Sequence, residues 1–324
     1  MLGEQNNSEG QDTASMQKDV MQNLLMASIK EQRRQRRWGI FFKSLTFVYL
    51  FVLLIAFIPG DGQDAGALSR GKHTALVDIN GVIADNTDAN ADNIISGIRD
   101  AFEDKNTAGI ILRINSPGGS PVQAGYVYDE IKRLREKYPD TKVYAVVTDV
   151  CASGGYYIAA AADEIYADKA SMVGSIGVLM NGFGFTKAME KLGVERRLYT
   201  AGESKGFLDP FSPQKAEDLE HVQGLLKNIH EQFIDVVKEG RGERLKNDPR
   251  LFTGLIWTGE ESVELGLIDG LGSSGYVARE IIQEDKIVDF TPKENYLERF
   301  AERLGVAMAN VMSTTITGGQ APLR

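Results

Sequence analysis

The sequence contains little cysteine, little histidine and no excess of positive charge. Its single cysteine, Cys151, excludes an internal disulfide and a cysteine-rich zinc cluster. Its three histidines include no H-E-x-x-H pair, so we expect no metal site of that kind and no cofactor. The formal net charge of −9 argues against a nucleic-acid partner, because phosphate binding needs a basic surface. The remaining composition is that of a globular protein with a sizeable core.

The longest hydrophobic run covers residues 38–58 and holds one charged residue, Lys43, near its start. A helix of about 20 apolar residues spans a hydrocarbon core of roughly 30 Å. A buried core helix rarely follows four arginines, and a cleavable signal peptide would have a shorter apolar run. The run follows the basic stretch K-E-Q-R-R-Q-R-R at 30–37, and positive charge stays in the cytoplasm. We therefore predict one transmembrane signal anchor in the inner (cell) membrane, with a cytoplasmic N-terminus and a periplasmic body.

The chain is predicted to have five parts. These are a polar and basic cytoplasmic tail (1–37), the transmembrane anchor (38–58), a Gly- and Asp-rich linker (59–72), a folded domain (73–290), and a C-terminal helix and tail (291–324).

Within the folded domain, short apolar runs alternate with helical patterns. The predicted strands are 74–79, 109–114, 142–148, 164–167 and 287–290, and the predicted helices are 90–105, 122–137, 155–162, 213–239 and 293–312. This alternation predicts an α/β fold with a mostly parallel sheet covered by helices. The helix 213–239 is the clearest, with Ser212 as its N-cap, Pro213 at its first position and Gly240 as its stop.

The histidines do not form a catalytic set in the sequence pattern. His221 and His230 lie nine residues apart on the predicted helix 213–239, which is about 180° of rotation. They cannot point into one site, and we interpret both as polar residues at the edge of an apolar stripe. His73 lies at the end of the linker, before the first strand. A catalytic serine would therefore need a base other than histidine.

Two glycine-flanked turns follow predicted strands. The stretch N-S-P-G-G-S at 115–120 either presents backbone N–H groups to an oxyanion or is an ordinary tight turn. In the stretch C-A-S-G-G, Ser153 stands at the start of an alanine-rich helix, where it is either a nucleophile or an N-cap. Cys151 is interpreted as a small buried packing residue, because no histidine is paired with it.

Lysine can replace histidine as the base that activates a serine. A lysine amine has an ordinary pKa of about 10.4, so it must be desolvated to act near neutral pH. Lys205 lies between Gly202 and Gly206 in the stretch Y-T-A-G-E-S-K-G-F-L-D-P-F. It is either this base or one of the many solvated surface lysines.

Six motifs, taken together and in order, resemble the signal peptide peptidase A family. They are V-D-I-N-G-V-I, R-I-N-S-P-G-G, A-S-G-G-Y-Y-I-A, V-G-S-I-G-V, G-E-S-K-G-F-L-D-P-F and W-T-G-E-E-S-V-E-L-G-L-I-D-G-L-G. The resemblance covers residues 74–285 and is to the short, single-repeat bacterial form. It implies a ClpP/crotonase-like core of repeated ββα units, with residues 73–290 as a serine peptidase domain.

The resemblance also implies roles for five residues. Ser153 is the implied nucleophile and Lys205 the implied general base, with Ser175 holding Lys205 in place. The N–H groups of Gly119 and Gly154 are the implied oxyanion donors. The family's ring-shaped homo-oligomers imply that the serine and the lysine come from neighbouring subunits. The implied substrates are remnant signal peptides and similar apolar peptides at the periplasmic membrane face.

Two other functions fit the same fold. One is a crotonase-type acyl-CoA enzyme, in which the glycine turns would bind a thioester carbonyl. The predicted anchor and external location argue against it, since coenzyme A is cytosolic. The other is a non-catalytic membrane scaffold.

Overall fold

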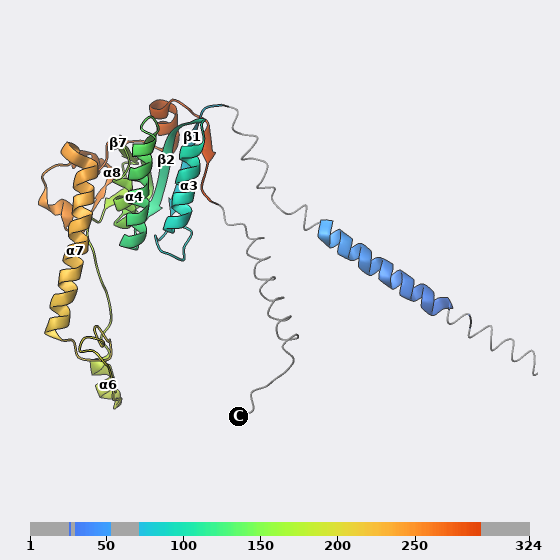
Figure 1. Cartoon of the computed structure of the whole chain (residues 1–324), viewed down its shortest axis with the longest axis horizontal. Coiled ribbons are helices and arrows are strands. Elements are labelled where there is room, and N and C mark those ends of the chain that lie inside the picture. Colours follow the sequence, from blue (N-terminus) through green and yellow to red (C-terminus); the bar gives the residue numbers. More distant parts are fainter. Residues whose placement is uncertain (1–25, 27–29, 53–70, 293–324) are drawn as a thin grey trace, which may run out of the picture. The chain divides into compact units, whose positions relative to one another are not determined.

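The computed structural model describes residues 26, 30–52 and 71–292 of the chain, in two separate units (Figure 1). The first unit contains a helix over residues 30–52, whose side chains are all exposed. This helix includes the predicted anchor as far as residue 52, and residues 53–58 lie outside the described part. Among the described residues, no helix is both long enough and apolar enough to cross a bilayer. The predicted helix 293–312 and most of the predicted tail and linker also lie outside the described residues.

The second unit is built on an eight-stranded, mostly parallel sheet (Figure 1). Its strands are β1 (His73–Asn80), β2 (Thr107–Ser116), β3 (Lys142–Ala152), β4 (Glu164–Ala167), β5 (Met172–Gly174), β6 (Ile256–Thr258), β7 (Gly270–Leu271) and β8 (Ile287–Asp289). The order is β6-β5-β3-β2-β1-β8, with β4 beside β3 and β7 beside β4. Only the β5–β6 pair is antiparallel in this sheet. The predicted α/β class and its five strands are confirmed.

The helices of this unit include the three predicted at 90–105, 122–137 and 155–162. They are α3 (Ala91–Glu103), α4 (Pro121–Lys137), α5 (Gly154–Ala159), α6 (Thr186–Leu192), α7 (Ala216–Arg241), α8 (Gly259–Glu264) and α9 (Ser274–Tyr276), with short turns η1 (Gly242–Arg244) and η2 (Pro249–Phe252) and a π-helix η3 (Val277–Ile282). Local capping explains where two of them begin. The Asn90 side chain accepts a hydrogen bond at the start of α3, and Ser120 does so at the start of α4.

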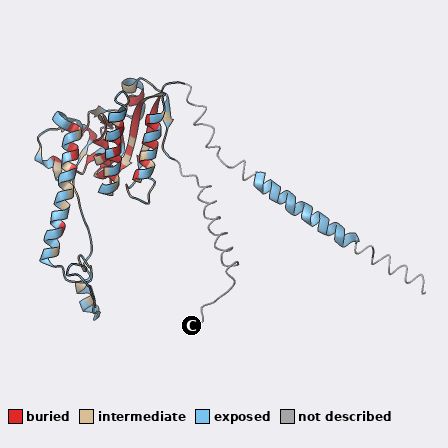
Figure 2. Cartoon of the chain, in the orientation of Figure 1, coloured by how far each residue is buried: buried red, intermediate tan, exposed pale blue. Residues whose placement is uncertain are grey.

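The core lies on both faces of the sheet, as the buried strands in Figure 2 show. In β2, Ile110 and Leu112 belong to the main cluster, which includes residues of α3, α4, α5 and α7. Ile111 belongs to a smaller cluster on the opposite side, with Val277 and Ala278 of η3. Because successive strand residues point to opposite faces and both faces are covered, the centre of β2, residues 109–112, is buried and apolar on both faces.

The predicted start of α7 is wrong. The helix begins at Ala216, three residues after Pro213, and its N-cap position is Lys215. The Ser212 hydroxyl instead donates to the Asp209 carboxylate, at 2.6 Å. A local hydrogen bond within the preceding turn therefore replaces the predicted cap.

The predicted stop at Gly240 is also wrong, because α7 continues to Arg241. A Cβ atom at Gly240 would lie 2.0 Å from the carbonyl oxygen of Ala160, just after α5. Gly240 therefore permits a close backbone contact and does not end the helix. About two helical turns before Gly240, the ring of Phe233 lies 5.2 Å from the ring of Tyr157. The C-terminal half of α7 therefore packs on the α5 region.

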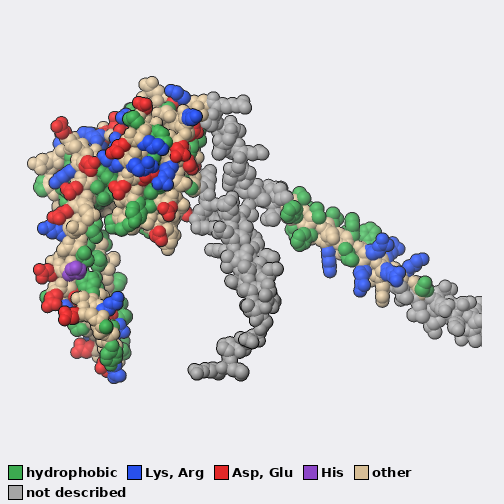
Figure 3. Space-filling view, in the orientation of Figure 1, with side chains coloured by type: hydrophobic (Ala, Val, Ile, Leu, Met, Phe, Trp, Pro, Cys, Tyr) green, Lys and Arg blue, Asp and Glu red, His purple; other side chains and the backbone are tan. Residues whose placement is uncertain are grey.

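Residues 178–215, called here the arm, include α6 and contain no buried residue. Leu179, Phe183 and Tyr199 are 80%, 82% and 89% exposed. Figure 1 shows the arm beside the N-terminal half of α7, and Figure 3 shows hydrophobic side chains on its surface. The arm therefore has no hydrophobic core of its own, and little apolar burial offsets the conformational entropy lost when it is ordered.

Candidate active site

Ser153 occupies a strained turn between β3 and α5. Its φ of 50° and ψ of −121° are rarely adopted by a residue with a side chain. Its N–H donates to the carbonyl of Gly174 at 2.8 Å, which holds the turn against β5. Ser153 stands at the N-cap position of α5, but its side chain makes no capping hydrogen bond. The N-cap interpretation is therefore wrong, and the hydroxyl is available for another role.

The turn after β2 lies directly against this serine. Gly118 and Gly119 have φ values of 98° and 155°. A Cβ atom at Gly118 would lie 2.7 Å from both the Ser153 Cβ and the Gly154 nitrogen. A Cβ atom at Gly119 would lie 2.0 Å from the carbonyl oxygen of Ile83. Only glycine at both positions allows this approach of backbone to backbone.

The two backbone amides expected to bind an oxyanion are neighbours in the structure. A Cβ atom built on Gly154 would lie 3.2 Å from the Gly119 nitrogen. Gly154 is the first residue of α5, where an N–H group has no acceptor within the helix. Among the described residues, neither N–H donates to another backbone group. Both are therefore free to bind an oxygen that carries negative charge.

One groove of about 590 Å³ contains Ser153, Gly119, Gly154 and Ser175. Ser175 follows β5 with a φ of 52°, and its N–H donates to the Leu255 carbonyl at 2.7 Å. The structure thus brings together four of the five predicted site residues.

The fifth predicted residue, Lys205, is not among the residues that line this groove. It is exposed and lies in the arm, within a turn where its N–H donates to the Gly202 carbonyl at 3.2 Å. Within one copy of the chain, the predicted base and nucleophile are therefore not brought into the same groove.

The groove also has walls that sequence reasoning missed. They are formed by Pro117, Pro121, Tyr157, Gly177, Val178, Leu179, Ile229, Gln232, Phe233, Thr253 and Gly254. Three of these residues come from α7 and two from the turn before β6. The apolar stripe of α7 was visible in the sequence, but its contact with the groove depends on the packing of α7 against α5.

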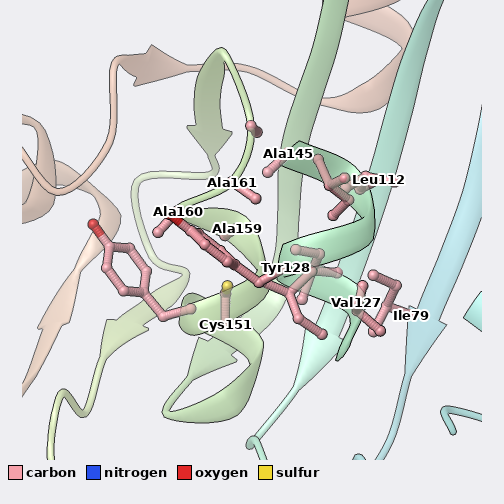
Figure 4. Close-up of a cluster of buried hydrophobic side chains, with 14 of the residues drawn as sticks. Ile79, Leu112, Val127, Tyr128, Ala145, Cys151, Ala159, Ala160 and Ala161 are labelled. Carbon is pink, nitrogen blue, oxygen red and sulfur yellow. The ribbon is translucent and has the colours of Figure 1, made fainter. Parts of the chain in front are cut away.

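Cys151 is fully buried, as expected. Its sulfur lies among the side chains of α5, α4 and the sheet, as Figure 4 shows. Burial raises the pKa of the Cys151 thiol far above its ordinary value, because the thiolate would lose its hydration. This environment suits packing and not nucleophilic attack.

The histidines remain separate in space. The His221 ring lies 5.5 Å from that of Phe207, edge to face. His230 Nε2 lies 3.2 Å from the carbonyl oxygen of Ile176, and His73 is buried within β1. Among the described residues, no group of histidine, cysteine, aspartate or glutamate side chains could hold a metal ion.

Comparison with known proteins places this site in a family. Residues 135–288 match the model of peptidase family S49. A putative signal peptide peptidase SppA of Enterococcus faecium is 31% identical, over 69% of this chain and 67% of that protein. A putative protease of Synechocystis sp. is 32% identical, over 63% of this chain and 72% of that protein.

A Brucella melitensis protein named Na(+)/H(+) antiporter NhaA is 46% identical over 65% of this chain. The match spans only 29% of that longer protein, so antiport is not carried over to this chain. The family-model match includes Ser153 and Ser175, and the relatives of similar length are named as peptidases or proteases. The chain belongs to peptidase family S49.

Proposed function

We propose that the chain is a membrane-anchored serine endopeptidase with Ser153 as nucleophile and Lys205 as general base. The observation that carries this proposal is the strained Ser153 turn, which lies in one groove with the free N–H groups of Gly119 and Gly154. A strained backbone at a serine between a strand and a helix is typical of a nucleophile that must project into a site.

The residues support a two-step acyl transfer. The Ser153 oxygen attacks the peptide carbonyl while the neutral Lys205 amine takes its proton. The carbonyl oxygen becomes an oxyanion, which accepts hydrogen bonds from the Gly119 and Gly154 N–H groups. Lys205 then gives the proton to the departing amine, and an ester on Ser153 remains. Water, activated by Lys205, attacks this ester and releases the second product, restoring the Ser153 hydroxyl.

We propose that Lys205 reaches the groove of a second copy of the chain. Lys205 is exposed in an arm without buried residues, outside the groove of its own copy. The arm's exposed side chains outside the groove, such as Phe183 and Tyr199, would be buried in such a homo-oligomer. Transfer into the groove would also remove water from the amine, which favours the neutral form that a base requires. Ser175, at the groove wall, would hold the amine by a hydrogen bond.

The proposed substrates are apolar peptides at the periplasmic face of the membrane, including remnants of cleaved signal peptides. The groove walls supply apolar contacts from Val178, Leu179 and Ile229. The hydrophobic run 38–58, behind the basic stretch 30–37, would keep the catalytic domain close to such peptides.

Substitution of the proposed dyad tests this function in the purified full-length chain. Ser153→Ala and Lys205→Ala should each lower cleavage of an apolar fluorogenic peptide by at least about 1,000-fold. Lys187→Ala is the matched control, since Lys187 is another exposed lysine of the arm. Normal cleavage by both dyad variants would refute the proposal.

Mixing the two inactive variants tests the second-copy arrangement. If Ser153 of one copy works with Lys205 of another, subunit exchange between Ser153→Ala and Lys205→Ala proteins restores part of the activity. If both residues act within one copy, no mixture recovers activity, because each copy lacks one of them.

A further inference from the structure

Helix α7 makes a polar contact with the wall of the proposed active site. His230 Nε2 lies 3.2 Å from the carbonyl oxygen of Ile176, which directly follows Ser175. We propose that His230 is a positioning residue, which holds the segment 174–179 against α7 and so sets the groove that contains Ser153. Its consequence for catalysis rests on the proposed function, whereas the contact itself does not.

The chemistry of the contact determines which ring nitrogen carries hydrogen. A carbonyl oxygen only accepts, so Nε2 of His230 must be the donor. Both the neutral ring with hydrogen on Nε2 and the protonated ring meet this requirement. Ile176 is fully buried, and a buried carbonyl without a donor is destabilising. His230 therefore supplies a hydrogen bond that the fold needs at this point.

Three hydrogen bonds fix the short segment around Ser175. The Gly174 carbonyl accepts from the Ser153 N–H at 2.8 Å, and the Ser175 N–H donates to Leu255 at 2.7 Å. These two bonds tie the segment to the Ser153 turn and to the chain before β6. The His230 bond is its link to α7. Because Ser175 has a φ of 52°, its conformation persists only if its surroundings hold it.

The same helix turn that carries His230 lines the groove. Ile229, Gln232 and Phe233 of α7 face the groove, as do Gly177 and Val178 beyond the bonded carbonyl. The His230 bond therefore joins two facing walls, one on α7 and one on the segment after β5. Losing it would let the walls move apart and would shift Ser175 relative to Ser153.

The test compares two substitutions at position 230 in the full-length chain. His230→Gln keeps an N–H donor near the Nε2 position, whereas His230→Leu removes the donor at similar volume. Glu231→Gln is the control, because Glu231 is an exposed neighbour on α7. Three quantities are measured for each variant. They are hydrogen–deuterium exchange in residues 174–180, the rate at which the protein cleaves an apolar peptide substrate, and the melting temperature Tm.

We expect His230→Leu to speed exchange in this segment by about tenfold, and His230→Gln and Glu231→Gln by less than about twofold. The kcat for an apolar peptide should fall by about tenfold in His230→Leu and recover in His230→Gln. If His230→Leu does not fold, His230→Asn takes its place, since its amide is too short to reach Ile176.

Unchanged exchange in the donor-free variant overturns the positioning role, whether or not the protein cleaves peptides. Equal loss of kcat in His230→Gln and His230→Leu also overturns it, because the donor would then be irrelevant. If exchange responds as expected but the parent protein cleaves no peptide, His230 still positions the segment, and the peptidase proposal is the one that fails.

Discussion

Asp269 ties α7 to the sheet, and its replacement by asparagine should strongly destabilise the domain. Its carboxylate accepts hydrogen bonds from Arg241 at 2.7 and 3.0 Å and from Arg244 at 3.0 Å. It also accepts from the N–H of Ile165 in β4 at 2.7 Å. The Arg241 side chain, near the end of α7, is only 1% exposed. The contact therefore joins a buried guanidinium to one carboxylate.

The expected loss follows from this burial. Asp269→Asn removes the negative charge and leaves the Arg241 charge buried without a matching partner. Breaking a buried pair in this way costs about 3–5 kcal/mol of unfolding free energy. In a domain of roughly 200 residues, 1 kcal/mol lowers Tm by about 2–4 °C. The variant should therefore melt about 6–20 °C below the parent protein at pH 7.

The difference should depend on pH. Burial alone would raise the pKa of Asp269, but the hydrogen bond and charge of Arg241 and the Ile165 N–H lower it more, so the net pKa is lowered. A carboxyl whose pKa is lower in the folded state stabilises the fold above its unfolded pKa of about 3.9. That contribution is lost as the pH falls through the folded-state pKa. The gap in Tm between parent and variant should thus be complete at pH 7 and narrow below about pH 4.

Differential scanning calorimetry at several pH values measures this gap. The matched control is Glu195→Gln, which breaks the exposed pair between Glu195 and Arg197. Exposed pairs contribute about 1 kcal/mol or less, so the control should melt within about 4 °C of the parent. A Tm for Asp269→Asn equal to that of the parent at pH 7 would refute the reasoning, as would a gap that is equally large at pH 3.

Three further results are expected. Gly119→Ala should lower kcat by at least about 100-fold, because the new Cβ atom would push the backbone away from Ile83 and misplace an oxyanion donor. Peptide cleavage by folded variant protein measures this. Cys151 should not react with a thiol reagent at pH 8 until denaturant is added, which absorbance of the released chromophore measures. Thr258→Ala should lower Tm by about 2–4 °C, because Thr258 and Glu261 form the capping box of α8; calorimetry detects this.

Much of the fold was predictable because its elements have strong local patterns. The strand β2 contains the buried apolar run 109–112, and α4 begins at Ser120 and Pro121, which are typical of a helix start. The short strands β5, β6 and β7 were not predicted, because two or three residues show at most weak periodicity, although β8, also three residues long, was predicted. The start of α7 was misplaced because Ser212 binds Asp209 instead of capping the helix.

The candidate site was predicted in part. Gly119, Ser153 and Gly154 lie in short motifs that contain glycines. Close backbone contacts require glycine at such positions, so these contacts can be inferred from the residue type alone. The α7 wall of the groove and the contact of His230 require no particular residue type and could not be inferred in this way. His230 was interpreted as an edge residue of an apolar stripe, and the stripe does not show which carbonyl lies beside it.

By itself, the sequence determined the α/β class and the positions of the main strands, and its glycine-flanked turns indicated where a candidate nucleophile and oxyanion donors could lie. These depend on hydrophobic periodicity, on turn chemistry and on residue type, which are properties of neighbours along the chain. Only the tertiary structure decided that Ser153, Gly119, Gly154 and Ser175 share one groove, that α7 forms its wall, and that Lys205 lies outside it within one copy. The physical reason is that these relations arise from packing between segments far apart in the chain, where buried contacts and unpaired hydrogen-bonding groups select one arrangement.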